Sequence, residues 1–197
     1  SDVYKRQIIE SNRYTGNMGD SYIRPSGKLN DIYGNEYERG LAIWIARWNA
    51  GHEKSWAWVK YNINNEYEYL QSDLVLVPSN NTTNFDTILD FYGDGKLLGS
   101  YEFRATDLPI KVAVNVSGVN ELKIYFHDNE YTGWGTRLGL ANCRLSYELD
   151  ESYGDEKTEF YKWMNNMPTL PESEARNILA FIYNSSSIQK ADLDGND

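Results

Sequence analysis

Several residue types are scarce in this chain of 197 residues, and each scarcity excludes a class of site. Its one cysteine, Cys143, cannot form an internal disulfide, and within a strand-like run it is more typical of a small buried side chain than of a nucleophile. The two histidines, His52 and His127, do not have the spacing of metal ligands. No apolar stretch approaches the roughly 20 residues that a membrane-spanning helix needs.

Positive charge is scarce as well. Lysine and arginine together number 19, against 29 aspartates and glutamates, which gives a formal net charge of −10. Such a chain repels phosphate backbones and anionic lipid surfaces. We therefore expect no nucleic acid and no membrane as a partner, and we expect a neutral ligand.

Aromatic side chains, by contrast, are plentiful: the chain has 16 tyrosines and 6 tryptophans, and asparagine is frequent. Aromatic rings stack on sugar rings, and amides hydrogen-bond to hydroxyl groups. The same residue types favour strands and turns, so an ordinary antiparallel β-domain has this bias too.

Short strands separated by turn residues are the expected structure of residues 40–149. Alternation of apolar and polar residues predicts strands over 41–46, 56–63, 74–77, 87–92, 96–98, 110–116, 122–126 and 138–149. Without intervening helices, this pattern predicts a mainly β fold, an antiparallel β-sandwich of jelly-roll type. Residues 1–39 are polar and predict an irregular lead-in with one strand at most.

The apolar period changes past the last predicted strand. Residues 160–167 and 175–182 each carry apolar side chains at helical spacing, and the proline-containing stretch 168–171 separates them. We therefore expect a helical hairpin over 151–191, following a sandwich over 1–150. The start at a serine and the abrupt end suggest a piece excised from a longer protein.

The last residues, 192–197, resemble the opening of a dockerin repeat. Asp192, Asp194 and Asn196 take the first, third and fifth positions of a calcium loop. The resemblance implies calcium as a cofactor and a cohesin on a scaffold protein as a partner. The acidic residue at position twelve is missing, so the calcium site cannot close within this chain.

Three motifs occur in a familiar order. The turn Gly93-Asp94-Gly95 is followed by Val114-Asn115-Val116-Ser117-Gly118-Val119 and then by Leu122-Lys123-Ile124, with Tyr37-Glu38-Arg39-Gly40-Leu41 upstream. Together they resemble the NPCBM modules, the novel putative carbohydrate-binding modules, over about residues 35–149. The resemblance implies a β-sandwich attached to secreted bacterial carbohydrate-active enzymes, and an extracellular or cell-surface location. The chain departs from the family at Trp44 and at 136–139, where members often carry a histidine, so sugar specificity does not transfer.

The loop 127–137 is the first candidate for a sugar site. Trp134 lies between two glycines and outside any alternating pattern, which core packing does not explain. Arg137 and Asp128 could together hydrogen-bond to neighbouring hydroxyls, beside His127 and Tyr131. The alternative is a solvated loop that closes the end of the sandwich.

The loop 48–56 is the second candidate, because it concentrates aromatic, amide and charged groups that include Trp48 and His52. Its alternative is a hairpin loop beside core tryptophans, since Trp56 and Trp58 share one face of a strand.

Catalysis has weaker support. The carboxylates available for glycoside hydrolysis, Glu66, Glu68 and Asp73, lie in a polar link that would not raise a pKa, and nucleophile or phosphate-loop motifs are missing. The sequence therefore predicts a non-catalytic carbohydrate-binding module that keeps a neighbouring catalytic domain near its glycan. The alternative is a structural or protein-interaction module beside a dockerin, without sugar binding.

Overall fold

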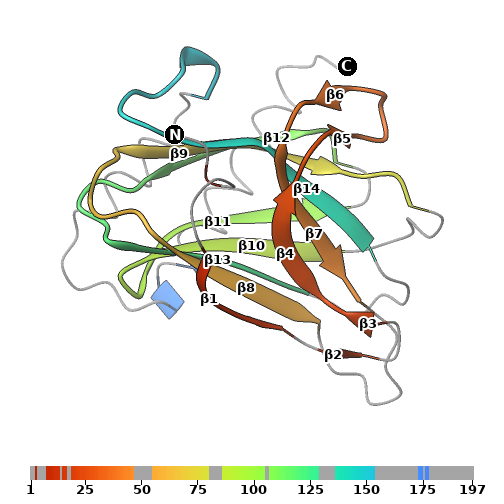
Figure 1. Cartoon of the computed structure of the whole chain (residues 1–197), viewed down its shortest axis with the longest axis horizontal. Helices are drawn as coiled ribbons and strands as arrows, with labels where there is room; N and C mark the ends of the chain where they lie inside the picture. The colour runs from red at the N-terminus through yellow and green to blue at the C-terminus, as the bar shows by residue number, and fades with distance from the viewer. Residues whose placement is uncertain are drawn as a thin grey trace, which may run out of the picture.

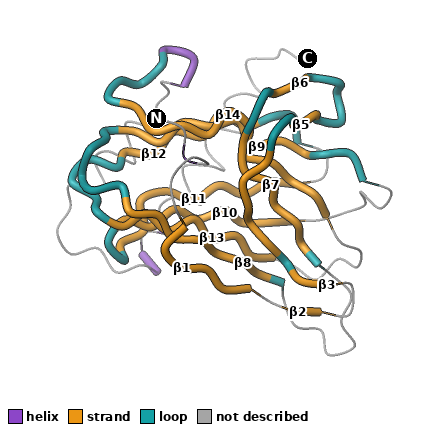
Figure 2. The backbone as a smooth tube through the Cα atoms, in the orientation of Figure 1, coloured by secondary structure: helices purple, strands orange, loops and turns teal. Residues whose placement is uncertain are grey.

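The described chain forms a sandwich of two five-stranded antiparallel sheets (Figure 1). A computed structural model describes residues 3, 8–13, 15–16, 19–46, 55–79, 86–104, 107–128, 136–153, 173–174 and 176–177. Strands dominate these residues (Figure 2), and none of their helical segments has the length and apolar character to span a bilayer.

Sheet I has the order β1-β8-β13-β10-β11. Its strands are β1 (Ile8–Arg13), β8 (Trp56–Asn62), β13 (Glu121–Asp128), β10 (Asp86–Gly93) and β11 (Lys96–Arg104). A tight turn joins β10 to β11, where Asp94 and Gly95 have φ of 48° and 82°. Gly95 adopts this left-handed conformation without steric cost, as the predicted hairpin requires.

Sheet II has the order β12-β9-β14-β7-β4. Its strands are β12 (Ile110–Asn115), β9 (Tyr69–Leu76), β14 (Thr136–Ser146), β7 (Gly40–Ile45) and β4 (Tyr22–Ser26). Strand β9 is buried along nearly its whole length, which confirms that 74–76 belong to a central strand, and Val77 lies just beyond its end.

A small hairpin packs on the outer face of sheet II. It consists of β5 (Leu29–Asn30) and β6 (Glu36–Tyr37), and Leu29 packs on Val75 and Ala141 of the sheet. The remaining elements are the pair β2 (Thr15–Gly16) and β3 (Gly19–Asp20), the 3-10 turn Glu151–Tyr153, and four helical residues at 173–174 and 176–177.

The core lies between the two sheets, where alternate side chains of every long strand meet. Ile43, Val59, Leu70, Ile124 and Phe126 are at most 2 % exposed. Cys143 is buried among them, as expected for a packing residue. The mainly β antiparallel sandwich predicted from alternation is confirmed.

Two expectations need correction. The lead-in 1–39 is not irregular, because it supplies an edge strand to each sheet, β1 and β4. Trp56 and Trp58 are not core residues, because the smaller Ala57 and Val59 face the interior. The structure does not support the helical hairpin, whose residues lie outside the described ranges except for Glu151–Tyr153 and the four helical residues named above.

Candidate functional site

Both predicted loops arise at one end of the sandwich, which we call the loop end. Strand β7 pairs with β14 up to Ile45 and Thr136, and β8 pairs with β13 up to Trp56 and His127. The segments 47–54 and 129–135 therefore connect neighbouring strand ends across the two sheets. The predicted Trp48, His52, Tyr131 and Trp134 are in these segments, outside the described residues.

Buried polar groups fix the strands beneath the loop end. The Oγ of Ser21 accepts a hydrogen bond from the backbone N–H of Ala46 at 3.0 Å, and the Oγ of Ser55 donates to the carbonyl of Ala46. Ser21 and Ser55 are at most 2 % exposed. The ends of sheet I and sheet II are thus tied together, which gives the connecting segments a rigid base.

Asp128 belongs to this buried base and not to a sugar site. It is 2 % exposed, and its Oδ2 accepts a hydrogen bond from the backbone N–H of Ser55 at 3.2 Å. Because His127 lies on the outer face of sheet I, alternation turns Asp128 inward. The structure therefore does not bring Asp128 and Arg137 together, because Arg137 points outward from the other sheet.

Arg137 is exposed on the outer face of sheet II, in one cross-strand row with Trp44 and Tyr22. The guanidinium carbon of Arg137 lies 5.5 Å from the centre of the Trp44 ring. Two residues further along β4, Arg24 lies 4.1 Å over the Tyr22 ring, and its Nη2 donates to the Tyr22 hydroxyl at 3.3 Å. We call Tyr22, Arg24, Trp44 and Arg137 the cationic-aromatic patch.

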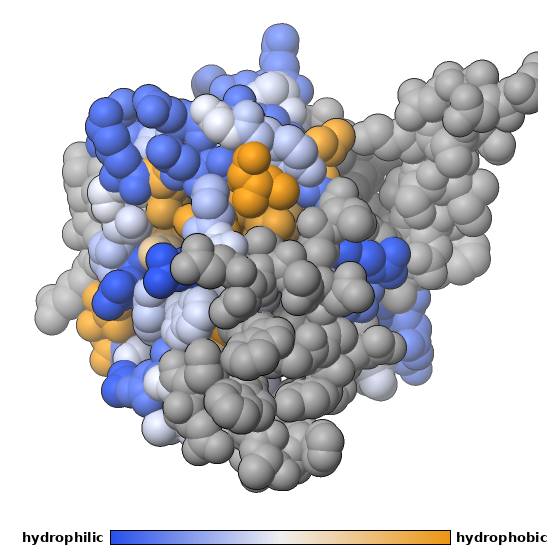
Figure 3. Space-filling model, turned by 90° about the vertical axis from the view of Figure 1, so that its right-hand side faces the viewer, coloured by the Kyte–Doolittle hydropathy of each residue, from blue (hydrophilic) through white to orange (hydrophobic). Residues whose placement is uncertain are grey.

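The patch offers two kinds of contact on one face. Tyr22 and Trp44 are half-buried rings, and Arg24 and Arg137 present N–H donors beside them. Figure 3 shows the side of the molecule that lies to the right in Figure 1, where the largest visible group of hydrophobic residues is in the upper half, among hydrophilic ones. Sequence reasoning identified Arg137 but missed the other three residues, although the inward set Leu41, Ile43 and Ile45 already turns Trp44 outward.

His127 belongs to a different arrangement, on the outer face of sheet I. Its Nε2 lies 2.9 Å from Oδ2 of Asp90, a fully buried carboxylate that also accepts a hydrogen bond from Ser100 at 2.6 Å. Arg176, from the helical residues after the sandwich, lies 2.9 Å from the same Oδ2 and donates to the Tyr92 hydroxyl at 2.6 Å. This face therefore holds part of the C-terminal region.

The ionisation of Asp90 is set by two opposing effects. Burial raises the pKa of this carboxyl, but the hydrogen bonds from His127, Arg176 and Ser100 outweigh burial and hold the pKa below its usual value. Asp90 is thus a charged structural centre. It touches no open surface that a ligand could reach, since its side chain is fully buried.

A second group of aromatic residues surrounds Lys123 on the outer face of sheet I. The Lys123 ammonium lies 4.9 Å from the Trp58 ring, 5.5 Å from that of Tyr92 and 5.2 Å from that of Tyr125. One lysine ammonium is thus shared by three rings, and unlike a guanidinium group it has no planar pair of donors for neighbouring hydroxyls. This group is therefore a weaker candidate than the cationic-aromatic patch.

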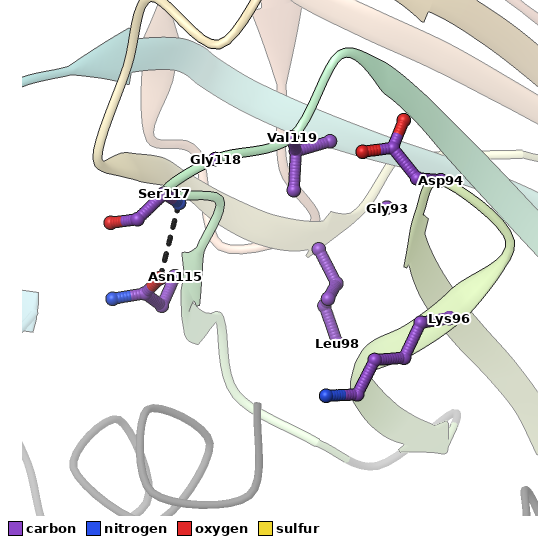
Figure 4. A pocket seen from close by; sticks show the side chains of 8 residues that line it. All are labelled: Gly93, Asp94, Lys96, Leu98, Asn115, Ser117, Gly118 and Val119. Atoms are coloured by element: carbon purple, nitrogen blue, oxygen red, sulfur yellow. Dashed lines mark hydrogen bonds between the residues drawn. The ribbon is translucent and has the colours of Figure 1, made fainter. Parts of the chain in front are cut away.

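Two of the motifs that resemble the NPCBM modules, at 93–95 and 114–119, meet around a pocket at the opposite end of the sandwich (Figure 4). The pocket has a volume of about 340 Å³, and four residues from 93–98 and four from 115–119 line it. The Asp94 carboxylate accepts hydrogen bonds from the backbone N–H groups of Asn120 and Glu121 at 3.1 and 2.8 Å. A Cβ at Gly93 would lie 2.6 Å from Val119, so these motif residues have structural roles.

The described ranges contain no metal site, because no three histidine, cysteine or carboxylate side chains in them lie close enough together to hold an ion. The predicted calcium ligands Asp192, Asp194 and Asn196 lie outside those ranges. Asp73, expected in a polar link, lies within β9 and forms an ion pair of 2.7 Å with Lys111. Its partner and its position in a strand make it structural.

No protein-family model matches the chain, and no curated protein matches it either. Among solved structures, the M60 catalytic domain with the CBM51-1 and CBM51-2 domains of Clostridium perfringens ZmpB is similar, with a TM-score of 0.55 and 12 % identity. The match covers 75 % of this chain and 15 % of that one.

Two further similar structures contain sugars. CBM51 from Clostridium perfringens GH95 in complex with methyl-galactose has a TM-score of 0.52 and 13 % identity, over 73 % of this chain and 99 % of that one. CBM51-2 of ZmpB in complex with GlcNAc, together with INT domains, has a TM-score of 0.54 and 12 % identity. This match covers 75 % of this chain and 31 % of that one. At these identities the likeness establishes the fold: the chain has the β-sandwich of these carbohydrate-binding modules.

Proposed function

We propose that the chain is a non-catalytic carbohydrate-binding module that holds a glycan at the loop end of its sandwich. The cationic-aromatic patch carries this proposal. Trp44 and Tyr22 provide ring faces for a sugar, and Arg137 provides donors for its hydroxyl groups. The patch adjoins the strand ends from which the segments with Trp48, His52, Tyr131 and Trp134 depart, so these residues join it in the proposed site.

The sugar-bound neighbours support this proposal by sharing the sandwich. We further propose the finer assignments of the sequence: an NPCBM-type sandwich over 1–150, a helical hairpin or linker over 151–191 and a dockerin-like calcium loop starting at 192, in a secreted or surface-attached bacterial protein. Binding would act by proximity, because tethering raises the effective concentration of an attached catalytic domain at its substrate.

A glycan array with the intact chain tests the proposal, followed by the variants Trp44→Ala and Trp58→Ala. Trp44→Ala should reduce glycan retention by tenfold or more, an effect of about 1.4 kcal/mol. Trp58→Ala removes a tryptophan from the other sheet that is half-buried like Trp44, and it should leave glycan retention unchanged. An empty array together with capture by a cohesin would instead establish the alternative, a protein-interaction module without sugar binding.

A further inference from the structure

Arg24 and Arg137 differ in their partners from three other arginines of the described surface. Arg13, Arg104 and Arg144 each form an ion pair with an aspartate or glutamate at 2.8 to 3.1 Å. Within the described ranges, neither Arg24 nor Arg137 has a carboxylate partner; each lies on an aromatic ring instead. Carboxylates outnumber bases by 29 to 19 in this chain, so a shortage of acidic residues does not explain the two unpaired guanidinium groups.

Stacking on a ring prepares a guanidinium group for a ligand. The planar group keeps its edge N–H donors available while its face rests on the ring, and the side chain loses rotamer freedom before binding. The edge donors match the two oxygens of a carboxylate or sulfate and form shorter, stronger hydrogen bonds to them than to neutral hydroxyls. The two arginines of the patch are thus arranged for an anion.

The spacing of the two arginines indicates the size of the ligand. Arg24 and Arg137 lie on strands β4 and β14, with β7 between them, and are offset by two residues along the strands. Sheet geometry places their Cα atoms about 12 Å apart. This distance exceeds the width of one sugar ring and suits an oligosaccharide that lies across Trp44.

We propose that the cationic-aromatic patch selects acidic glycans, with Arg137 on a sugar carboxylate or sulfate, Trp44 under the sugar ring and Arg24 on a second acidic group or a hydroxyl. This inference rests on the proposed function and reverses the neutral ligand expected from the net charge of −10. The net charge acts at long range and is screened by salt, whereas the bidentate contacts act at hydrogen-bond distance. Local geometry therefore decides the ligand.

The test is an array that pairs each acidic glycan with its neutral parent: sialyllactose and 3′-sulfated lactose with lactose, and oligogalacturonate with its methyl ester. The intact chain should retain at least one acidic member about tenfold more strongly than its parent. The sialyl and sulfated arms distinguish a carboxylate from a sulfate. Raising sodium chloride from about 50 mM to about 500 mM should reduce the preference, because salt weakens exposed ion pairs.

Variants identify the residues responsible. The variant Arg137→Ala should weaken the preference for acidic glycans, and the double variant Arg24→Ala with Arg137→Ala should abolish it. Arg137→Lys should keep only part of the preference, because lysine has the charge of arginine but not its planar pair of N–H donors. Arg144→Ala removes the same charge from the same sheet, at a site already paired with Asp150, and should keep the preference. Circular dichroism confirms that each variant is folded.

The outcomes separate the two proposals. Equal retention of acidic glycans and their neutral parents overturns the acidic preference and leaves the proposed function standing. Loss of the preference in Arg144→Ala to the same degree as in Arg137→Ala also overturns it, because net charge alone would then explain binding. An array on which the intact chain retains nothing overturns the proposed function and this inference together.

Discussion

Trp134 lies between Gly133 and Gly135 in the segment that joins β13 to β14, where no strand pattern accounts for it. We expect Trp134→Ala to abolish glycan retention, because the variant loses a stacking surface. The midpoint of thermal unfolding should change little, since the residue lies outside the alternating core pattern. Affinity electrophoresis and a thermal melt measure the two effects, and retained binding would remove Trp134 from the proposed site.

Asp90 gives a prediction about pH. Its pKa lies below the usual value in the folded state, so its stabilising contribution is present above the unfolded pKa of about 3.9 and disappears as the pH falls through the folded pKa. Asp90→Asn removes this titration. The variant should be less stable than wild type at pH 7 by about 1–3 kcal/mol, and the difference should shrink below pH 4.

Urea unfolding between pH 2 and pH 7 measures the Asp90 effect. Asp94→Asn is the comparison variant. Asp94 also accepts two hydrogen bonds, but it lies in an exposed turn and not in a buried site. A difference between wild type and Asp90→Asn that stays constant over the whole pH range would show that the Asp90 carboxylate does not titrate as proposed.

Single residues were predictable where alternation fixes the direction of a side chain and unpredictable where direction depends on the partner sheet. The inward set Ile110, Val112 and Val114 follows from alternation alone, and all three pack in or against the core. In β8 both faces carry apolar residues, so alternation separates Trp58 from Val59 without telling which is inside. The sandwich accommodates the smaller side chains inside and leaves the tryptophans on the outer face.

At the level of elements, the contact between the β5–β6 hairpin and sheet II depends on small residues. A Cβ at Gly40 would lie 2.3 Å from the carbonyl oxygen of Leu140 and 2.8 Å from Leu29. Gly40→Ala should therefore lower the free energy of unfolding by about 2 kcal/mol or more, because backbone atoms must shift.

Gly27→Ala is the matched control for Gly40→Ala. No atom lies within 4 Å of its added Cβ, and its φ is not positive. It should leave the free energy of unfolding within about 0.5 kcal/mol of wild type or raise it slightly. Chemical denaturation of both variants checks the pair; equal effects would mean that the hairpin and sheet II separate without cost.

The central strands were predictable from the sequence, whereas the edge strands were not. Strand β13 has a strong apolar signal because both of its sides are paired and one face is buried, whereas β9 has this signal only in its second half, since Gln71, Ser72 and Asp73 make the first half read as a polar link. Strand β1 exposes five of its six residues and joins the sheet through its backbone, so its side chains carry no signal. Strand β4 contains Pro25, which an edge strand tolerates but which obscures the pattern.

At the scale of the whole molecule, Arg176 joins the sandwich to residues that follow it. Arg176→Ala removes a charged donor from the fully buried Asp90 and should lower the free energy of unfolding by about 1–3 kcal/mol. Arg144→Ala is the control, because its ion pair with Asp150 is 35 % and 49 % exposed and should contribute less than about 1 kcal/mol. Denaturant titrations compare them, and an equal loss would mean that Arg176 is not an anchor.

The hairpin on sheet II also limits how a long polymer can approach. Leu29 packs over Gly139, two residues along β14 from Arg137, a step of about 7 Å. A polysaccharide laid parallel to the strands would meet this obstruction after roughly one residue, whereas a chain crossing the strands or a free terminus would not. A polymer bound at Trp44 therefore either crosses the strands or is bound at one of its ends.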